Sequence, residues 1–297
     1  MATNTTNIDF YQEITNQIIE ALEQGITPWS CPWDEEQANG IPSNFSTKSS
    51  YQGMNIMLLW MSAYKNSFSS SKWLTFKQAK TLGGQVRKGE KGTRIFFYKM
   101  VEKKEQGSGK EESDFYPVLK NYAVFNLDQI DGIEDENNEK KVVIRDKVTL
   151  LDDVEQFITH TEATIRYTGQ KAFFRPSSDE IVIPERDRFH SSADLYATIL
   201  HELTHWTGHK NRLGREFKGK FGTKDYAFEE LIAELGSAFL MADLGIDGDV
   251  QHDSYIASWL TALKNDKRYI FKAAAQASKA HQYLKALTEA PEQLNAA

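Results

Sequence analysis

His201-Glu202-Leu203-Thr204-His205 is the segment whose residue types and spacing most clearly suggest chemistry. Histidines four positions apart lie on one face of a helix, so both imidazoles can bind one metal ion. With a third, carboxylate ligand, a fourth position is left for water, whose pKa zinc lowers to roughly 7. Glu202 follows the first histidine, where its carboxylate can take a proton from that water and later give it to a leaving amine. The segment predicts a metal-dependent hydrolase with His201 and His205 as ligands and Glu202 as catalytic base.

The residues just after this segment bear on the third ligand. One class of zincin peptidases continues with glycine at +3 and histidine or aspartate at +6 from the second histidine. Here Gly208 matches the first of these positions, but Asn211 stands at the second, and His209 is two residues early. The sequence therefore disfavours that class.

A later acidic segment offers the other source of a third ligand. Glu230 and Glu234 are four residues apart, which resembles the arrangement of gluzincins, in which the first acid binds the metal and the second orients a histidine. Glu229 lies about 100° around the helix from Glu230, so only one of the two would coordinate. Both stay open as ligands, with Glu230 preferred. Three polar side chains are candidates to stabilise an oxyanion: Tyr226, Tyr196 and His190.

Periodicity predicts the elements that must hold these residues. In the second half we expect long helices over 193–207 and 226–244, a helix near 152–162, and one or two helices over 259–283. The expected strands, read as an antiparallel meander, are 164–167, 172–175 and 180–183. In the first half, Ile14, Ile18 and Leu22 recur every four residues. Further elements expected there are helices over 51–65 and 76–82 and strands over 94–101 and 116–125, so the fold class is α+β.

The net charge of −7 over 297 residues argues against a nucleic-acid partner only if the charge is evenly spread. It is not: residues 72–104 hold ten Lys/Arg and two Glu, whereas residues 128–139 hold six acids and no base. The basic stretch also carries several aromatic residues. Cations that contact phosphates, next to rings on which bases stack, are what single-stranded nucleic acid needs.

Composition excludes several classes of protein. The 26% charged and 40% apolar residues are ordinary for a globular chain, which argues against disorder, collagen and coiled coils. The single cysteine, Cys31, cannot form an intramolecular disulfide and is read as an inert thiol. Because no secretory signal and no apolar run of about 18 residues is seen, we expect a cytoplasmic protein with no membrane contact.

Longer motifs give a family resemblance that covers almost the whole chain. The first half resembles the N-terminal domain of ArdC-type antirestriction proteins, also found in conjugative primases of the TraC type. The segments that carry it include 25–29, Tyr51-Gln52-Gly53-Met54-Asn55, 73–79, 84–93 and 124–130. Gln52 is a departure, because arginine is expected there, and it loses one phosphate contact. The second half resembles the zincin-like domain of the same proteins over 179–184, 201–213 and 226–235.

The resemblance implies a single-stranded-DNA-binding domain (1–140, with an acidic linker at its end) joined to a zincin-like metallopeptidase domain (141–297). It implies a conjugative-element protein that protects incoming DNA from host restriction. The expected partners are single-stranded DNA and an unidentified protein substrate. Zinc is the metal favoured by the donor set, with manganese as the alternative. The alternative function is a DNA-shielding protein whose metal site is structural or idle. The expected DNA-binding residues are Tyr51, Asn55, Trp73, Lys77, Lys80, Arg87, Lys88, Lys91 and Arg94.

Overall fold

The computed structural model describes residues 9–29, 40–102, 115–135, 148–215, 223–248 and 255–289. Two of the sequence predictions, the inert Cys31 and the domain boundary near residue 140, fall outside these ranges. None of the helices in the described ranges is long and apolar enough to cross a membrane.

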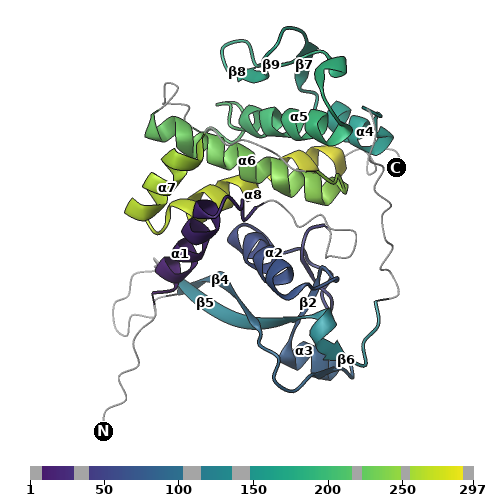
Figure 1. The fold of residues 1–297 in the computed structure, drawn as a ribbon, viewed down its shortest axis with the longest axis vertical. Coiled ribbons are helices and arrows are strands. Elements are labelled where there is room, and N and C mark those ends of the chain that lie inside the picture. The colour runs from purple at the N-terminus through teal and green to yellow at the C-terminus, as the bar shows by residue number, and fades with distance from the viewer. Residues whose placement is uncertain are drawn as a thin grey trace, which may run out of the picture.

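The N-terminal half is a small mixed sheet with helices around it (Figure 1). It begins with α1 (Phe10–Glu23), which Asp9 caps by accepting a hydrogen bond from the Gln12 N–H. Four strands lie in the order β1-β2-β5-β4, and α2 (Met54–Asn66) packs against β4. The strands are β1 (Ser43–Asn44), β2 (Lys72–Thr75), β4 (Thr93–Glu102) and β5 (Phe115–Asn126). A short helix α3 (Phe76–Thr81) and a β3–β6 pair (Gln85–Val86 with Ile130–Asp131) complete this half.

The C-terminal half places a three-stranded sheet beside a group of helices (Figure 1). Its strands are β7 (Thr164–Tyr167), β8 (Phe173–Arg175) and β9 (Glu180–Ile183). Its helices are α4 (Asp152–His160), α5 (Ser192–Thr207), α6 (Lys224–Leu244), α7 (Ile256–Asn265) and α8 (Tyr269–Glu289). The expected helices are therefore present, and the C-terminal segment forms a pair of helices that is interrupted at Asp266.

The predicted meander is wrong. β9 lies in the centre of its sheet, antiparallel to β8 but parallel to β7. All four residues of β9 are buried, whereas β7 and β8 contain no buried residue. The most apolar strand therefore takes the central position, with a neighbour on each side, and the two more polar strands form the edges.

The two halves share one hydrophobic core. Its buried residues come from α1, α2 and β4 on one side and from α6, α7 and α8 on the other. Trp60 of α2 packs against Phe239 of α6, with ring centroids 5.9 Å apart, and Trp29 meets Trp259 of α7 at 5.5 Å. Helix α6, which carries Glu230 of the predicted metal site, is thus packed directly on the N-terminal half.

Candidate metal centre

Helix α5 brings His201 and His205 to one buried face. Ser191 caps the helix by accepting a hydrogen bond from the Asp194 N–H, and both histidines are less than 10% exposed. Their Nε2 atoms lie 3.2 Å apart. Two nitrogen ligands about 2.0–2.1 Å from one tetrahedral ion would be roughly 3.4 Å apart, so the spacing fits a shared ion.

Glu230 of α6 completes the set. Its Oε2 lies 3.5 Å from His201 Nε2, and its Oε1 lies 3.5 Å from His205 Nε2. In the described part of the chain, His201, His205 and Glu230 are the group whose ligand atoms all lie within 4.8 Å of one another. Two imidazoles and one carboxylate form a donor set that suits a divalent ion with an open position.

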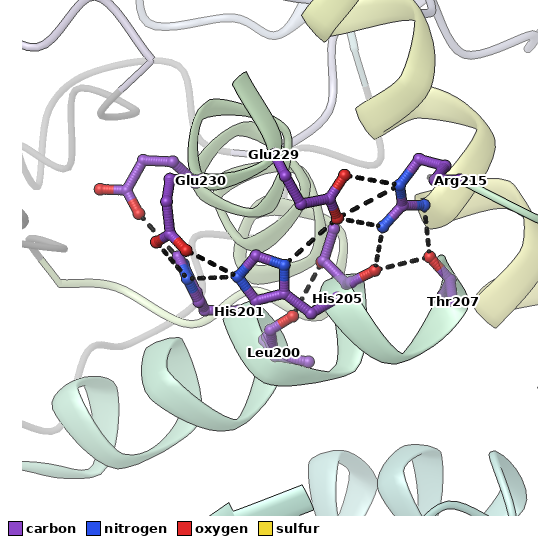
Figure 2. Close-up of polar contacts among 9 residues, drawn as sticks. Leu200, His201, His205, Thr207, Arg215, Glu229 and Glu230 are labelled. Carbon is purple, nitrogen blue, oxygen red and sulfur yellow. Dashed lines mark hydrogen bonds and ion pairs between the residues drawn. The ribbon is translucent and has the colours of Figure 1, made fainter. Parts of the chain in front are cut away.

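Glu229, the other glutamate that the spacing left open, faces a different atom. Its Oε1 lies 3.2 Å from His205 Nδ1, on the side of the ring away from Glu230, as Figure 2 shows. Arg215 holds this carboxylate, with Nη2 2.9 Å from Oε1 and Nε 3.1 Å from Oε2. Arg215 also donates to Thr207 Oγ1 and to the Thr204 carbonyl. Glu229 therefore supports a ligand and does not itself reach the shared position.

Glu234 gives His201 a matching neighbour. It is one turn along α6 from Glu230, is 3% exposed, and places Oε2 3.3 Å from His201 Nδ1. Each imidazole thus has a carboxylate at Nδ1, which favours the tautomer whose Nε2 lone pair is free for a metal. The sequence had suggested this role for Glu234, whereas nothing in the sequence pointed to Arg215.

The imidazoles and carboxylates of the site shift one another's pKa values. Burial lowers the pKa of His205, but its contacts with Glu229 and Glu230 more than offset this and raise the pKa to about 9. The pKa of His201 is also raised, against the effect of burial, by Glu230 and Glu234. Burial favours the neutral form of Glu230, yet the two histidines hold the pKa of its carboxyl well below the usual range. A divalent cation can take the place of these protons.

Glu202, the predicted catalytic base, is buried on α5, and its negative charge raises the pKa of both histidines. Its carboxylate therefore lies near the two imidazoles. Tyr226 is also close enough to the site to be affected by it. Burial, and after it the charge of Glu230, raise the pKa of its hydroxyl.

The other two oxyanion candidates lie elsewhere. Tyr196 is fully buried, donates to Glu155 Oε1 at 2.9 Å and accepts from the Leu151 N–H. His190 is exposed on the segment before α5. Asn211 and His209, the residues that separated the two zincin classes, are not part of the metal group, and the His209 ring packs against Phe174.

The predicted DNA-binding residues separate into two groups. Lys77, Lys80, Lys88, Lys91 and Arg94 are exposed on α3, the segment after β3 and the start of β4. Arg87 is exposed as well, but it is paired with Glu90 and Asp131, each at 3.3 Å.

The three non-basic residues are buried, contrary to what their expected role requires. Trp73 is 1% exposed and packs against Phe68, so its ring offers no face to a base. Tyr51 is 6% exposed and its hydroxyl contacts Asn44. Asn55 uses its amide to bond the backbone of Phe96. These aromatic and amide side chains pack and hydrogen-bond inside the core. Composition alone cannot distinguish such residues from those of a binding surface.

Comparison with known proteins gives the family. Residues 152–276 match a zincin-like metallopeptidase family, and residues 8–125 match the N-terminal domain of anti-restriction factor ArdC. The crystal structure of the antirestriction ArdC protein from the R388 plasmid, in a metal-free form, is 42% identical, with a TM-score of 0.81 over 94% of this chain and 98% of that one. The chain belongs to the ArdC family. The resemblance and the two-part α+β fold predicted from the sequence are thereby confirmed.

Other ArdC relatives differ in length. An uncharacterized protein of Sinorhizobium fredii, y4eC, is 35% identical over 93% of this chain and 91% of its own length. A DNA primase TraC of Escherichia coli is 37% identical, but the match spans only 20% of that protein. A Mn(II)-bound structure of the R388 ArdC protein is 40% identical to this chain, with a TM-score of 0.79 over 96% of this chain and 100% of that one.

Proposed function

We propose that this ArdC-family chain binds single-stranded DNA and hydrolyses peptide bonds at a divalent metal held by His201, His205 and Glu230. The observation that carries the peptidase half is the convergence of three ligand atoms within 4.8 Å. The carboxylates at both Nδ1 atoms support it, because a metal-binding histidine typically has its other ring nitrogen hydrogen-bonded to a carboxylate.

A divalent ion held by His201, His205 and Glu230 would supply the Lewis acidity that activates water and polarises the substrate carbonyl. Glu202 accepts the proton of the attacking water and delivers it to the departing amine. Tyr226, beside Glu230, is placed to donate a hydrogen bond to a developing oxyanion. Glu229 and Glu234 keep the two imidazoles in one orientation and tautomer throughout.

The choice of metal follows from the donor set. Two imidazoles and a carboxylate favour zinc, and a carboxylate-containing site also accepts manganese. The Mn(II)-bound relative supports manganese as the second candidate for this chain. Competition between the two ions for the purified apoprotein, followed by elemental analysis, decides between them.

The DNA-binding half is supported by the exposed lysines of α3 and of the segment that leads into β4. Their charge would attract phosphates, and the affinity would fall steeply with salt. By holding DNA, the chain would concentrate the peptidase near proteins bound to an incoming strand and so protect that strand from restriction.

The deciding experiment compares Glu202→Gln with the wild type. We expect cleavage of a protein substrate, assayed with and without single-stranded DNA, to be lost in the variant while metal content and DNA affinity stay unchanged. Protection is then measured by conjugation into restriction-proficient recipients. If Glu202→Gln protects fully, the peptidase is not the mechanism, and the chain acts instead by shielding DNA.

A further inference from the structure

A groove of about 870 Å³ lies where the two halves of the chain meet. Its walls come from α1, the first turn of α2 and β4 on one side and from α8 on the other, elements that adjoin in Figure 1. None of the metal-centre residues lines it, and neither do the exposed lysines of α3. The groove is therefore a separate feature of the molecule.

Its lining contains three cations and no acid. Arg268, Lys272 and Lys279 are exposed, and spacings of four and seven residues put them on one face of α8 and the residues just before it. Together they run along about 16 Å of helix, against a rise of about 3.4 Å per nucleotide in one strand of B-DNA. Lys272 is 2.9 Å from Asp266, and both side chains are largely exposed, so this pair costs little to open. This row of charge suits a chain of phosphates better than a single anion.

Aromatic rings from both sides also line the groove. Tyr11 of α1 and Phe271 of α8 form a T-shaped pair with centroids 4.7 Å apart, and Phe96 of β4 lies 5.7 Å from Phe271. Tyr11 and Phe271 are only partly buried. Rings beside cations are the combination that lets a protein hold bases without reading their sequence.

Hydrogen-bond donors complete the lining. Gln52 and Gln282, which both carry side-chain amides, are exposed residues of the lining. The thirteen-residue helix α2 begins here at Met54, and its N-cap, Gly53, offers no side chain to the first N–H groups, so the positive end of the helix adds to the field. Gly53 lies against Ala274 of α8 and has φ +56°, a backbone conformation that favours glycine.

We propose that this groove binds single-stranded DNA, with phosphates along Arg268, Lys272 and Lys279 and bases against Tyr11 and Phe271. The inference rests on the proposed DNA-binding function and places the DNA in a groove lined by residues of both halves. An acidic peptide would satisfy the cations but would leave the aromatic rings without a matching partner.

The test uses the full chain and a fluorescein-labelled oligothymidylate, with binding followed by fluorescence anisotropy over a range of salt. For the double variant Lys272→Gln/Lys279→Gln we expect about tenfold weaker binding and a salt slope shallower by about 1.4, since each lost contact to a single strand removes about 0.7. The matched control is Lys65→Gln/Lys264→Gln, which removes the same charge from exposed positions outside the groove. Circular dichroism melting verifies that all variants fold.

Photocross-linking supplies a readout that needs no substitution. Oligonucleotides with 5-iododeoxyuridine should link to peptides that contain Tyr11 or Phe271, as identified by mass spectrometry. The groove is ruled out if its double variant binds like the wild type, or loses no more affinity than the control. If that result comes with lost binding in a Lys77→Gln/Lys80→Gln variant, the proposed function stands and only the groove fails. If the wild type does not bind the oligonucleotide at all, both fail.

Discussion

Arg215 donates hydrogen bonds to both carboxylate oxygens of Glu229, and the same carboxylate faces Nδ1 of His205. The three residues form a line in which the guanidinium orients a glutamate and the glutamate orients a metal ligand. Glu229 and Glu230 are neighbours in sequence, but this line gives them different roles. Each role predicts a different effect of substitution on metal binding.

Replacing Arg215 by lysine should weaken metal binding about 10- to 100-fold, as is typical when a residue that orients a ligand is lost. Lysine keeps the charge but cannot form the two parallel bonds that hold Glu229. The affinity is measured by competition with a chromophoric chelator. Glu229→Gln should give a loss of similar size, whereas Glu230→Gln should lose far more because it removes a ligand. Equal losses for Glu229→Gln and Glu230→Gln would contradict the assignment.

Gly236→Ala should lower the free energy of unfolding by about 1–3 kcal/mol. A Cβ at Gly236 would lie 2.5 Å from Cγ2 and 2.7 Å from Oγ1 of Thr204, which is fully buried on α5. The glycine thus lets α6 approach α5 nearly two turns from Glu230, against the residue that precedes His205. Urea unfolding measures the loss.

The control for Gly236→Ala is the double variant Thr204→Ala/Gly236→Ala. Alanine at position 204 removes the two nearest atoms and leaves only its Cβ, 3.1 Å from the new methyl group, so most of the stability should return. If the double variant is as unstable as the sum of the two single variants, the clash is not the cause.

Asn55→Ala should destabilise the chain by about 2–4 kcal/mol, because it leaves two buried backbone groups without partners. The Asn55 amide donates to the Phe96 carbonyl at 2.8 Å and accepts from the Phe96 N–H at 3.0 Å. Asn55→Asp should not restore the stability, because it keeps the acceptor but sets a buried carboxylate oxygen against the Phe96 carbonyl. A variant with unchanged stability but lost affinity for single-stranded DNA would restore the role that the sequence suggested for Asn55.

The metal centre was largely predictable because helical periodicity restricts it. The four-residue spacing of His201 and His205, and of Glu230 and Glu234, already places each pair on one face. The spacing preferred Glu230 over Glu229 but could not exclude Glu229, whose role depends on Arg215 from a loop before α6. No sequence rule sets the direction of that side chain.

The DNA-binding residues, in contrast, were only partly predictable from the sequence. Composition correctly found a basic segment, but it could not tell that Trp73 is core and Lys77 surface, since β2 and α3 bury neighbouring residues differently. Nor could it place Asn55 opposite α8, more than 200 residues away, because only the shared core brings α2 and α8 together. Contacts between distant segments are the part of a site that sequence patterns leave open.

Asp243 links α6 to α8, and its contribution to stability should depend on pH. Its carboxylate lies 3.1 Å from His281 Nε2 and 2.9 Å from Lys285 Nζ. Burial raises the pKa of this carboxyl, but the bonds from His281 and Lys285 outweigh burial and lower it to about 2. The folded pKa is thus below the unfolded value of about 4, so the carboxylate stabilises the folded state above pH 4, and this contribution is lost as the pH falls toward 2.

We therefore expect Asp243→Asn to lower the free energy of unfolding by about 1–2 kcal/mol at neutral pH, after allowance for partial exposure. The difference from the wild type should shrink steadily below about pH 4, because the variant has no carboxyl to protonate. Urea unfolding at several pH values measures both curves. Asp187→Asn, at an exposed position between β9 and α5, serves as the control and should show no such convergence. A constant difference between wild type and Asp243→Asn from neutral pH down to pH 3 would mean that packing, and not charge, accounts for the role of Asp243.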